Sequence, residues 1–204
     1  MQAFYLLENP KAESSIRQGI TTVVVGNCGM SAAPIYNDFR PASSIFPGKI
    51  EYAWETMEEY LSKIESIGLS VNMAAMTGHC NIRAAGMAYE KGSPSPEEMA
   101  TMKRILQETF DAGVWGMSTG MIYPPGCFAD RAELVELLKV VAENNGVHHS
   151  HIRGQGETLI AAVQEMLHLS ESAGAPLHIL HHKGMGDANA PKVMVTLEMV
   201  EEAI

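Results

Sequence analysis

The chain has 204 residues, 46% of them hydrophobic and 19% charged, a composition typical of a globular protein with a sizeable core. Its formal net charge is −10 at pH 7, so we expect no nucleic-acid partner, because phosphate binding requires a basic surface. No apolar run approaches the roughly 20 residues of a membrane span, the start does not resemble a signal peptide, and an odd number of cysteines favours a reduced, cytoplasmic protein.

One arrangement recurs along the chain: an amphipathic stretch ends in glycine directly before an apolar run. The glycines are Gly19, Gly68, Gly113, Gly146 and Gly174. Glycine accepts the left-handed conformation in which a helix ends and the next strand begins. Five such joints predict alternating helices and strands, and therefore a parallel sheet with crossover helices.

The predicted elements follow one another without a linker or a low-complexity tract. After a helix-like start, short apolar runs predict strands over residues 22–25, 71–76, 114–118, 147–150 and 177–180. Apolar residues at three-to-four spacing predict helices over residues 54–67, 96–111, 158–173 and from residue 191 to the C-terminus. Asp130 and Glu133 resemble a capping box that opens a further helix. Residues 41–48 are rich in Pro, Gly and Ser and indicate a loop.

The number of predicted strands indicates an incomplete barrel. A (β/α)8 barrel has eight strands and usually needs roughly 200 to 250 residues or more. Five units with long loops use up this chain, which begins and ends on helical segments. We therefore interpret residues 1–204 as a single α/β domain, an interior slice of a TIM-type barrel. A freestanding doubly wound sheet is the structural alternative.

Three side chains that can bind a metal fall at predicted strand tips: Cys28, His151 and His181. The C-terminal tips of parallel barrel strands face one pocket, so these side chains are expected to converge. A thiolate and two imidazoles suit zinc and leave a coordination position open for water or substrate. The alternative is that Cys28 is simply buried and that the histidines are hydrogen-bonded core residues.

Four strings in this order resemble the D-aminoacylase (N-acyl-D-amino-acid deacylase) family of the amidohydrolase superfamily. They are GITTVVVGNCG at residues 19–29, GMSTGMIYPPG at 116–126, SHIR at 150–153 and HHK at 181–183. The resemblance covers nearly the whole chain. It implies a (β/α)8 barrel of the metal-dependent hydrolase type and zinc-dependent hydrolysis that releases a free D-amino acid.

The resemblance also implies roles for single residues. Cys28, His151 and His181 match the family's zinc ligands on its second, fifth and sixth strands. Lys183 matches the group that holds the substrate carboxylate, a role that suits an ammonium. Tyr123 matches a tyrosine that contacts the scissile amide and stabilises the oxyanion; the alternative for Tyr123 is a turn tyrosine before two prolines.

Other polar residues have less definite expectations. Strand alternation points His182 away from the pocket, to a packing or supporting role. His79 and Arg83 follow a predicted strand and either line the pocket or belong to an ordinary loop. His148 and His149 are interpreted as core and pocket-wall residues. We expect Cys80 and Cys127 to be free thiols that bind no metal. No role is assigned to His168, His178 or Asp187.

The chain departs from the family pattern in two places. No histidine precedes His79, so the family's His-x-His pair on the first strand is missing, and its catalytic aspartate on the eighth strand would lie beyond Ile204. The resemblance therefore implies strands 2 to 6 of the parent barrel, without the first, seventh and eighth. We expect the chain to be a fragment or a truncated relative with little activity alone. Its exposed strand edges predict self-association.

The leading hypothesis is zinc-dependent hydrolysis of N-acyl-D-amino acids, small-molecule substrates, to a carboxylate and a D-amino acid. A catalytically inactive metal-binding or assembly module is the alternative. A cyclic-amide hydrolase of the hydantoinase or dihydroorotase type is a weaker one, because the fourth strand ends in Met117, Ser118 and Thr119 without the lysine that bridges metals in those relatives.

Overall fold

All strands in the described part of the protein are parallel, and they follow the order of the sequence. The computed structural model describes residues 2–37, 39–41 and 52–203. Strand β1 (Thr22–Val25) pairs with β2 (Asn72–Ala75), and β3 (Thr77–Gly78), β4 (Gly116–Gly120), β5 (Val147–His151) and β6 (Leu177–Ile179) form a second sheet in that order. Met76 alone separates β2 from β3. Its amide donates to the Val25 carbonyl, and the Trp115 amide donates to the Ala75 carbonyl, so the two sheets are continuous through the backbone.

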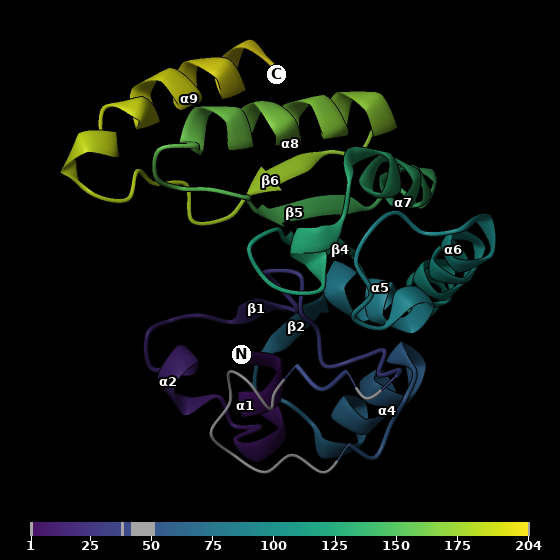
Figure 1. The fold of residues 1–204 in the computed structure, drawn as a ribbon. Coiled ribbons are helices and arrows are strands. Elements are labelled where there is room, and N and C mark those ends of the chain that lie inside the picture. The colour runs from purple at the N-terminus through teal and green to yellow at the C-terminus, as the bar shows by residue number, and fades with distance from the viewer. Residues whose placement is uncertain (1, 38, 42–51, 204) are drawn as a thin grey trace.

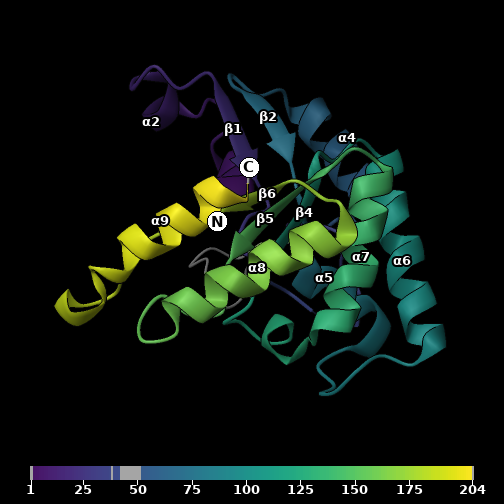
Figure 2. The same cartoon turned by 90° about the horizontal axis from the view of Figure 1, so that it is seen from above.

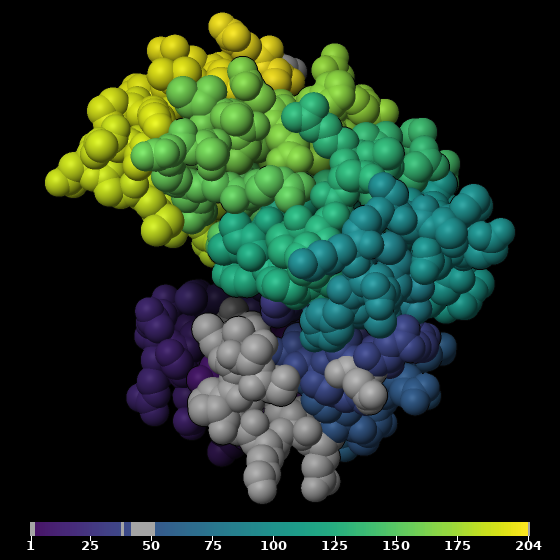
Figure 3. Space-filling model, in the orientation of Figure 1, coloured from purple at the N-terminus to yellow at the C-terminus, as the bar shows by residue number. Residues whose placement is uncertain are grey.

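The helices form an arc outside the strands (Figures 1 and 2). Each βα unit packs on the next, in the order α5, α6, α7, α8, α9. Figure 3 shows the N-terminal segments at one end of the molecule and α9 at the other. The helices are α1 (Gln2–Glu8), α2 (Glu13–Ile16), α4 (Met57–Ile67), α5 (His79–Met87), α6 (Pro96–Asp111), α7 (Arg131–Glu143), α8 (Leu159–Ala173) and α9 (Lys192–Glu202). Short 3-10 turns span Gly126–Phe128 and Asp187–Asn189.

The start of α6 shows how local sequence sets a helix boundary. The Ser95 hydroxyl accepts from the Glu98 amide at 3.2 Å, and the Glu98 carboxylate accepts from the Ser95 amide at 2.7 Å. This capping box, with Pro96 at the first helical position, satisfies backbone donors that a helix start leaves unpaired. The predicted bounds of this helix are confirmed.

Helix α4 begins three residues later than the sequence predicts, at Met57. Thr56 forms a capping box with Glu59, which fixes the first turn. Trp54 is buried instead in the preceding segment, where its indole N–H donates to the Ala32 carbonyl at 2.8 Å. A tertiary contact thus outweighs the apolar periodicity on which the longer helix was predicted.

The main core lies between β4, β5 and the helices α6, α7 and α8. Its fully buried side chains include Leu106, Met117, Leu134, Leu138 and Val163. Burial of each such side chain stabilises the fold by roughly 1.5–3 kcal/mol. A second core gathers the first helix, β1, β2 and α4. All five residues of β4 are buried, as expected for a strand that is covered on both faces.

Four of the five predicted glycine joints use glycine with a positive φ, at Gly19, Gly68, Gly113 and Gly174. The fifth differs, because Asn145 takes the left-handed conformation with φ 53°. Gly146 has another role, since a Cβ there would lie 2.7 Å from the Phe110 ring. The glycine therefore permits close packing of α6 on the start of β5.

Most of the predicted loop at residues 41–48 lies outside the described residues, as does residue 204, and α9 ends at Glu202. Within the described part of the chain, no helix is both long enough and apolar enough to cross a bilayer.

Candidate metal centre

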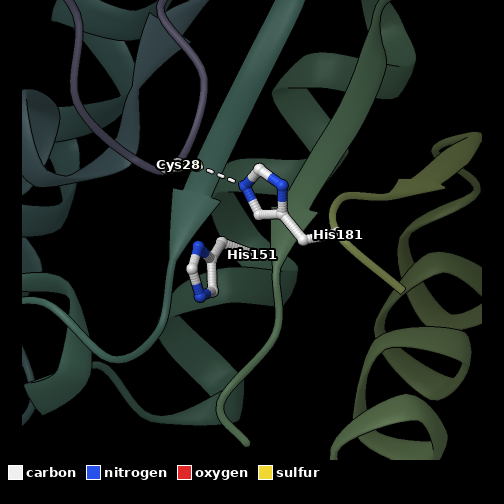
Figure 4. A group of neighbouring side chains, drawn as sticks. All are labelled: Cys28, His151 and His181. Atoms are coloured by element: carbon white, nitrogen blue, oxygen red, sulfur yellow. Dashed lines mark hydrogen bonds between the residues drawn. The ribbon is translucent and has the colours of Figure 1, made fainter. Parts of the chain in front are cut away.

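Cys28, His151 and His181 converge at the C-terminal ends of the strands. Cys28 lies in the loop after β1, His151 is the last residue of β5, and His181 follows β6. The Cys28 Sγ lies 3.1 Å from the His181 Nε2, and one donor atom of each of the three residues lies within 4.8 Å of the others. Figure 4 shows the His181 ring pointing toward Cys28, with His151 beside it. The predicted convergence is therefore present in the structure.

Two of these residues have an unusual backbone conformation. Cys28 and His181 have φ values of 59° and 54°, in the left-handed region that residues with side chains seldom adopt. Such a conformation costs on the order of 1–3 kcal/mol and persists only where neighbouring groups hold it. At His181 one such group is Gln155, whose side-chain amide donates to the His181 carbonyl at 3.0 Å. The left-handed conformations thus occur in the loops that follow β1 and β6, directly where the two side chains join the cluster.

The donor set fits zinc. Zinc bonds of about 2.3 Å to sulfur and 2.0–2.1 Å to nitrogen, at tetrahedral angles, place the two donor atoms roughly 3.6 Å apart. The Cys28 Sγ lies 3.1 Å from the His181 Nε2, slightly closer than this value. The three ligand atoms all lie within 4.8 Å of one another, so the largest separation they can have is somewhat above it. The Nδ1 of His151 is buried and has no hydrogen-bond partner among the described residues. Small side-chain movements would therefore be enough to hold the ion.

The surroundings set the protonation states of these groups. Burial raises the pKa of the Cys28 thiol, so the metal-free thiol keeps its proton at neutral pH. Burial, followed by the electrostatic effect of the nearby His181 and Lys183 side chains, lowers the pKa of His151 and leaves a neutral imidazole. A neutral imidazole is ready to bind a metal, whereas the thiol must first lose a proton.

Tyr123 and Lys183 lie near the cluster. The Tyr123 ring packs edge-on against His151 with ring centroids 5.3 Å apart. Burial and then the charge of Cys28 raise the pKa of Tyr123, so it remains a hydrogen-bond donor. Lys183 is exposed two residues after His181, close enough for its charge to act on His151. A cavity of about 300 Å³ opens beside Cys28 and Tyr123.

The structure corrects the expectation for His79 and Arg83. They neither line the pocket nor belong to a loop, because both are buried in α5 and contact Glu133 of α7. Glu133 in turn gives only half of the predicted capping box. Its amide bonds Asp130 at 2.9 Å, but its carboxylate binds His79 and Arg83 instead of returning to the Asp130 amide.

The other histidines pack as follows. The His182 Nε2 lies 2.8 Å from the Thr196 hydroxyl of α9, on the side away from the cluster. His148 is fully buried, with its Nε2 2.9 Å from the Thr119 hydroxyl. His149 lies 2.9 Å from the Asn27 side chain and packs against the His178 ring, with ring centroids 4.7 Å apart and the planes tilted by 34°. Cys80 and Cys127 are free thiols outside the cluster.

Three contacts near the cluster were not predicted from the sequence. They are the hydrogen bonds of Ser118, the hydrogen bond of Gln155 to His181, and the contact between Asn27 and His149. Ser118 had a usable signal, because it alternates with Gly116 and Gly120 on one face of β4 and so faces the same side as the strand-tip residues. Gln155 and Asn27 lie in loops, where no periodicity reports direction.

No family model matches the chain. Two curated relatives from Alcaligenes xylosoxydans xylosoxydans match nearly all of it: a D-aminoacylase is 34% identical over 201 residues, and an N-acyl-D-glutamate deacylase is 38% identical over 197. The crystal structure of N-acyl-D-glutamate deacylase from Bordetella bronchiseptica, complexed with zinc and a phosphonate inhibitor, superposes with a TM-score of 0.91 at 36% identity. Over nearly its whole length, the chain is therefore similar to part of the D-aminoacylase family.

The alignments cover nearly all of this chain but less than half of each relative. They take in 98% and 97% of this chain but only 42% and 40% of the two curated relatives, and 42% of the solved structure. The chain therefore spans about two fifths of the length of these relatives. Its α/β class and its parallel strands are confirmed, and it also superposes with a TM-score of 0.91 on a D-aminoacylase crystal structure described as defining a novel subset of amidohydrolases.

Proposed function

We propose that this D-aminoacylase relative holds one zinc ion with Cys28, His151 and His181, in a site for hydrolysing N-acyl-D-amino acids to a carboxylate and a free D-amino acid. The observation that carries the proposal is the convergence of the three donor atoms from three separate strand ends. When bound there, zinc supplies Lewis acidity toward the amide and an activated water.

The chain's own side chains would act on the substrate. The Tyr123 hydroxyl, kept protonated by its raised pKa, donates a hydrogen bond to the amide oxygen as negative charge grows on it. Lys183 offers an exposed ammonium that pairs with the substrate carboxylate. The cavity of about 300 Å³ is lined by Cys28 and Tyr123 but not by His151, His181 or Lys183, so we propose that it takes only one end of the substrate.

One chemical requirement is not met by the described residues. No aspartate or glutamate of the described chain joins the three-residue cluster, so a carboxylate is absent where a proton must pass to the leaving amine. General acid–base catalysis contributes about 10² to 10⁴ in rate. We therefore propose that the 204-residue chain binds zinc but turns over slowly. The same observation supports a second function, a metal-binding module without turnover.

We also infer that the chain associates with itself. Among the described strands, β1 pairs only with β2 and β6 only with β5, so two parallel edges have free backbone groups. Ile20 and Val24 are exposed at the β1 edge, and a groove of about 970 Å³ lies between β6, α8 and α9. Unpaired edges beside exposed apolar groups favour pairing with another chain.

The test of the metal site is the zinc content per chain, measured by elemental analysis on the wild type, Cys28→Ser and Cys127→Ser. Cys127 is a free, partly exposed thiol outside the cluster and serves as the matched control. We expect about one zinc in the wild type and in Cys127→Ser, and a loss in Cys28→Ser. Equal zinc in all three proteins, or none in the wild type, would refute the assignment.

The reaction is tested separately on the zinc-loaded chain. N-acetyl-D-amino acids are compared with their L-enantiomers, and a hydantoin serves as the cyclic-amide control. Slow hydrolysis of D-substrates alone supports the deacylase proposal. Zinc binding without any hydrolysis supports the module without turnover.

A further inference from the structure

The loop that carries Cys28 rests on a single buried serine of the neighbouring strand. The Ser118 hydroxyl donates to the Gly26 carbonyl at 2.5 Å and accepts from the Gly29 amide at 3.0 Å. Ser118 is fully buried and belongs to β4. The two contacts lie on either side of Cys28 in sequence, so one hydroxyl ties both ends of the turn that gives Cys28 its left-handed backbone.

The same turn packs against glycine backbone with no space for a side chain. A Cβ at Gly120 would lie 2.0 Å from the Cys28 carbonyl oxygen, and one at Gly78 would lie 2.6 Å from the Gly29 carbonyl oxygen. The Cys80 amide also donates to the Gly29 carbonyl at 2.9 Å. The turn therefore sits directly on β3 and β4, and Ser118 supplies the side-chain contact that links it to β4.

Loss of this hydroxyl would affect Cys28 before it affects the sheet. The ladder of β4 is made by backbone groups, which a Ser118→Ala substitution leaves in place. The buried Gly26 carbonyl and Gly29 amide, however, would lose this partner, and unpaired buried groups are unfavourable. The turn would then relax toward a conformation that suits a residue with a side chain, and the direction of the Cys28 thiol would change.

We propose that Ser118 is a positioning residue that aims the Cys28 sulfur at His151 and His181 and thereby sets the metal affinity of the cluster. This inference rests on the proposed zinc site. It adds a residue that touches neither metal nor substrate and that acts through Cys28 alone.

The experiment uses the full 204-residue chain loaded with Co²⁺, because a cobalt–thiolate bond gives a near-ultraviolet charge-transfer band that reports on Cys28 directly. Zinc affinity is measured in parallel by competition with a chromogenic chelator. The variants are Ser118→Ala, Cys28→Ser, the double variant, and Ser170→Ala. Ser170 is the matched control, since its hydroxyl donates to the Ala175 carbonyl at 2.6 Å in a region remote from the turn.

We expect Ser118→Ala to weaken zinc binding about 10- to 100-fold and to diminish or shift the cobalt band, with Ser170→Ala unchanged. In the Cys28→Ser background, Ser118→Ala should cause no further loss, because its effect passes through the thiol. Far-ultraviolet circular dichroism checks that each variant is folded.

Three results would overturn the proposal: wild-type affinity and band in Ser118→Ala, an equal loss in both backgrounds, or a Ser118→Ala chain that does not fold. The last two would assign Ser118 to stability of the sheet. A failure of the zinc site itself looks different, since the wild type would then show no cobalt–thiolate band and Cys28→Ser would bind metal as well as the wild type.

Discussion

The buried group of His79, Arg83 and Glu133 allows a sharp prediction about stability. The side chains of all three are fully shielded from solvent. The Glu133 carboxylate binds His79 at 2.8 Å and forms an ion pair with Arg83. Burial alone would raise the pKa of Glu133, but the hydrogen bonds and charges of His79 and Arg83 outweigh burial and lower it. Glu133 is therefore the anion that compensates a buried guanidinium.

We predict that Glu133→Gln destabilises the chain by about 3–5 kcal/mol, the cost of leaving one partner of a buried ion pair without its counter-charge. Arg83 would retain only the carbonyls of Glu90 and Gly92, at 3.1 and 2.8 Å. Glutamine preserves the volume of the side chain, so the change is mainly electrostatic. Against a typical total of about 5–15 kcal/mol, the loss would be a large fraction of the free energy of unfolding.

The control lies one turn along the same helix. Glu136 binds Lys139 at 2.7 Å and also pairs with Lys103, but its side chain is 39% exposed. Glu136→Gln should therefore cost less than about 1 kcal/mol. Urea denaturation followed by circular dichroism should lower the midpoint by roughly 1–2 M in Glu133→Gln and hardly at all in Glu136→Gln.

A double variant tests the mechanism. Replacing Arg83 by methionine in the Glu133→Gln background removes the unpaired charge and should recover part of the lost stability. Equal midpoints for Glu133→Gln and Glu136→Gln, or no recovery in the double variant, would refute the view that charge compensation determines the effect.

The remaining predictions concern pH and association. Burial, and then the charges of His79 and His149, lower the pKa of His148 to about 3, whereas an unfolded histidine titrates near 6.5. Between pH 6.5 and 3 the unfolded chain binds a proton at this histidine more readily than the folded chain does. The stability that neutral His148 contributes is therefore fully present above about pH 6.5 and is lost as pH falls toward 3, at up to about 1.4 kcal/mol per pH unit. Urea midpoints from about pH 7 to 5 should fall less steeply in His148→Asn, and an unchanged slope would contradict the assignment. Light scattering at micromolar concentration should detect dimers or larger species, and Val24→Lys, at a residue 41% exposed on β1, should shift them toward monomer; a wild type that is already monomeric would count against association.

The sequence alone determined those features that depend on nearby residues. Ser95, Pro96 and Glu98 predict the start of α6, because the capping groups and the amides they bind lie within one helical turn. The glycine joints predict the alternation of helices and strands, since a left-handed residue is common where a helix ends. From that alternation, the place of Cys28, His151 and His181 at one end of a parallel sheet follows by topology.

Only the tertiary structure decided how the polar groups pair across the chain. Glu133 has the local pattern of a capping box, yet its carboxylate binds residues of α5 that lie 54 and 50 positions earlier. Trp54 continues a helical periodicity, yet its indole binds Ala32 before the helix begins. A buried hydrogen bond or ion pair outweighs a local preference of a few tenths of a kcal/mol, and its partner is invisible in a short window of sequence.

The same distinction between sequence and tertiary structure applies to the metal centre. The residue types and their strand-tip positions were determined by the sequence, because parallel strands bring their ends together. The left-handed backbone of Cys28 and His181, and the Ser118 and Gln155 contacts that hold it, were decided by the tertiary structure. A backbone conformation that is unfavourable locally is stable only when groups from other strands and loops fix it, and those groups meet only in the folded chain.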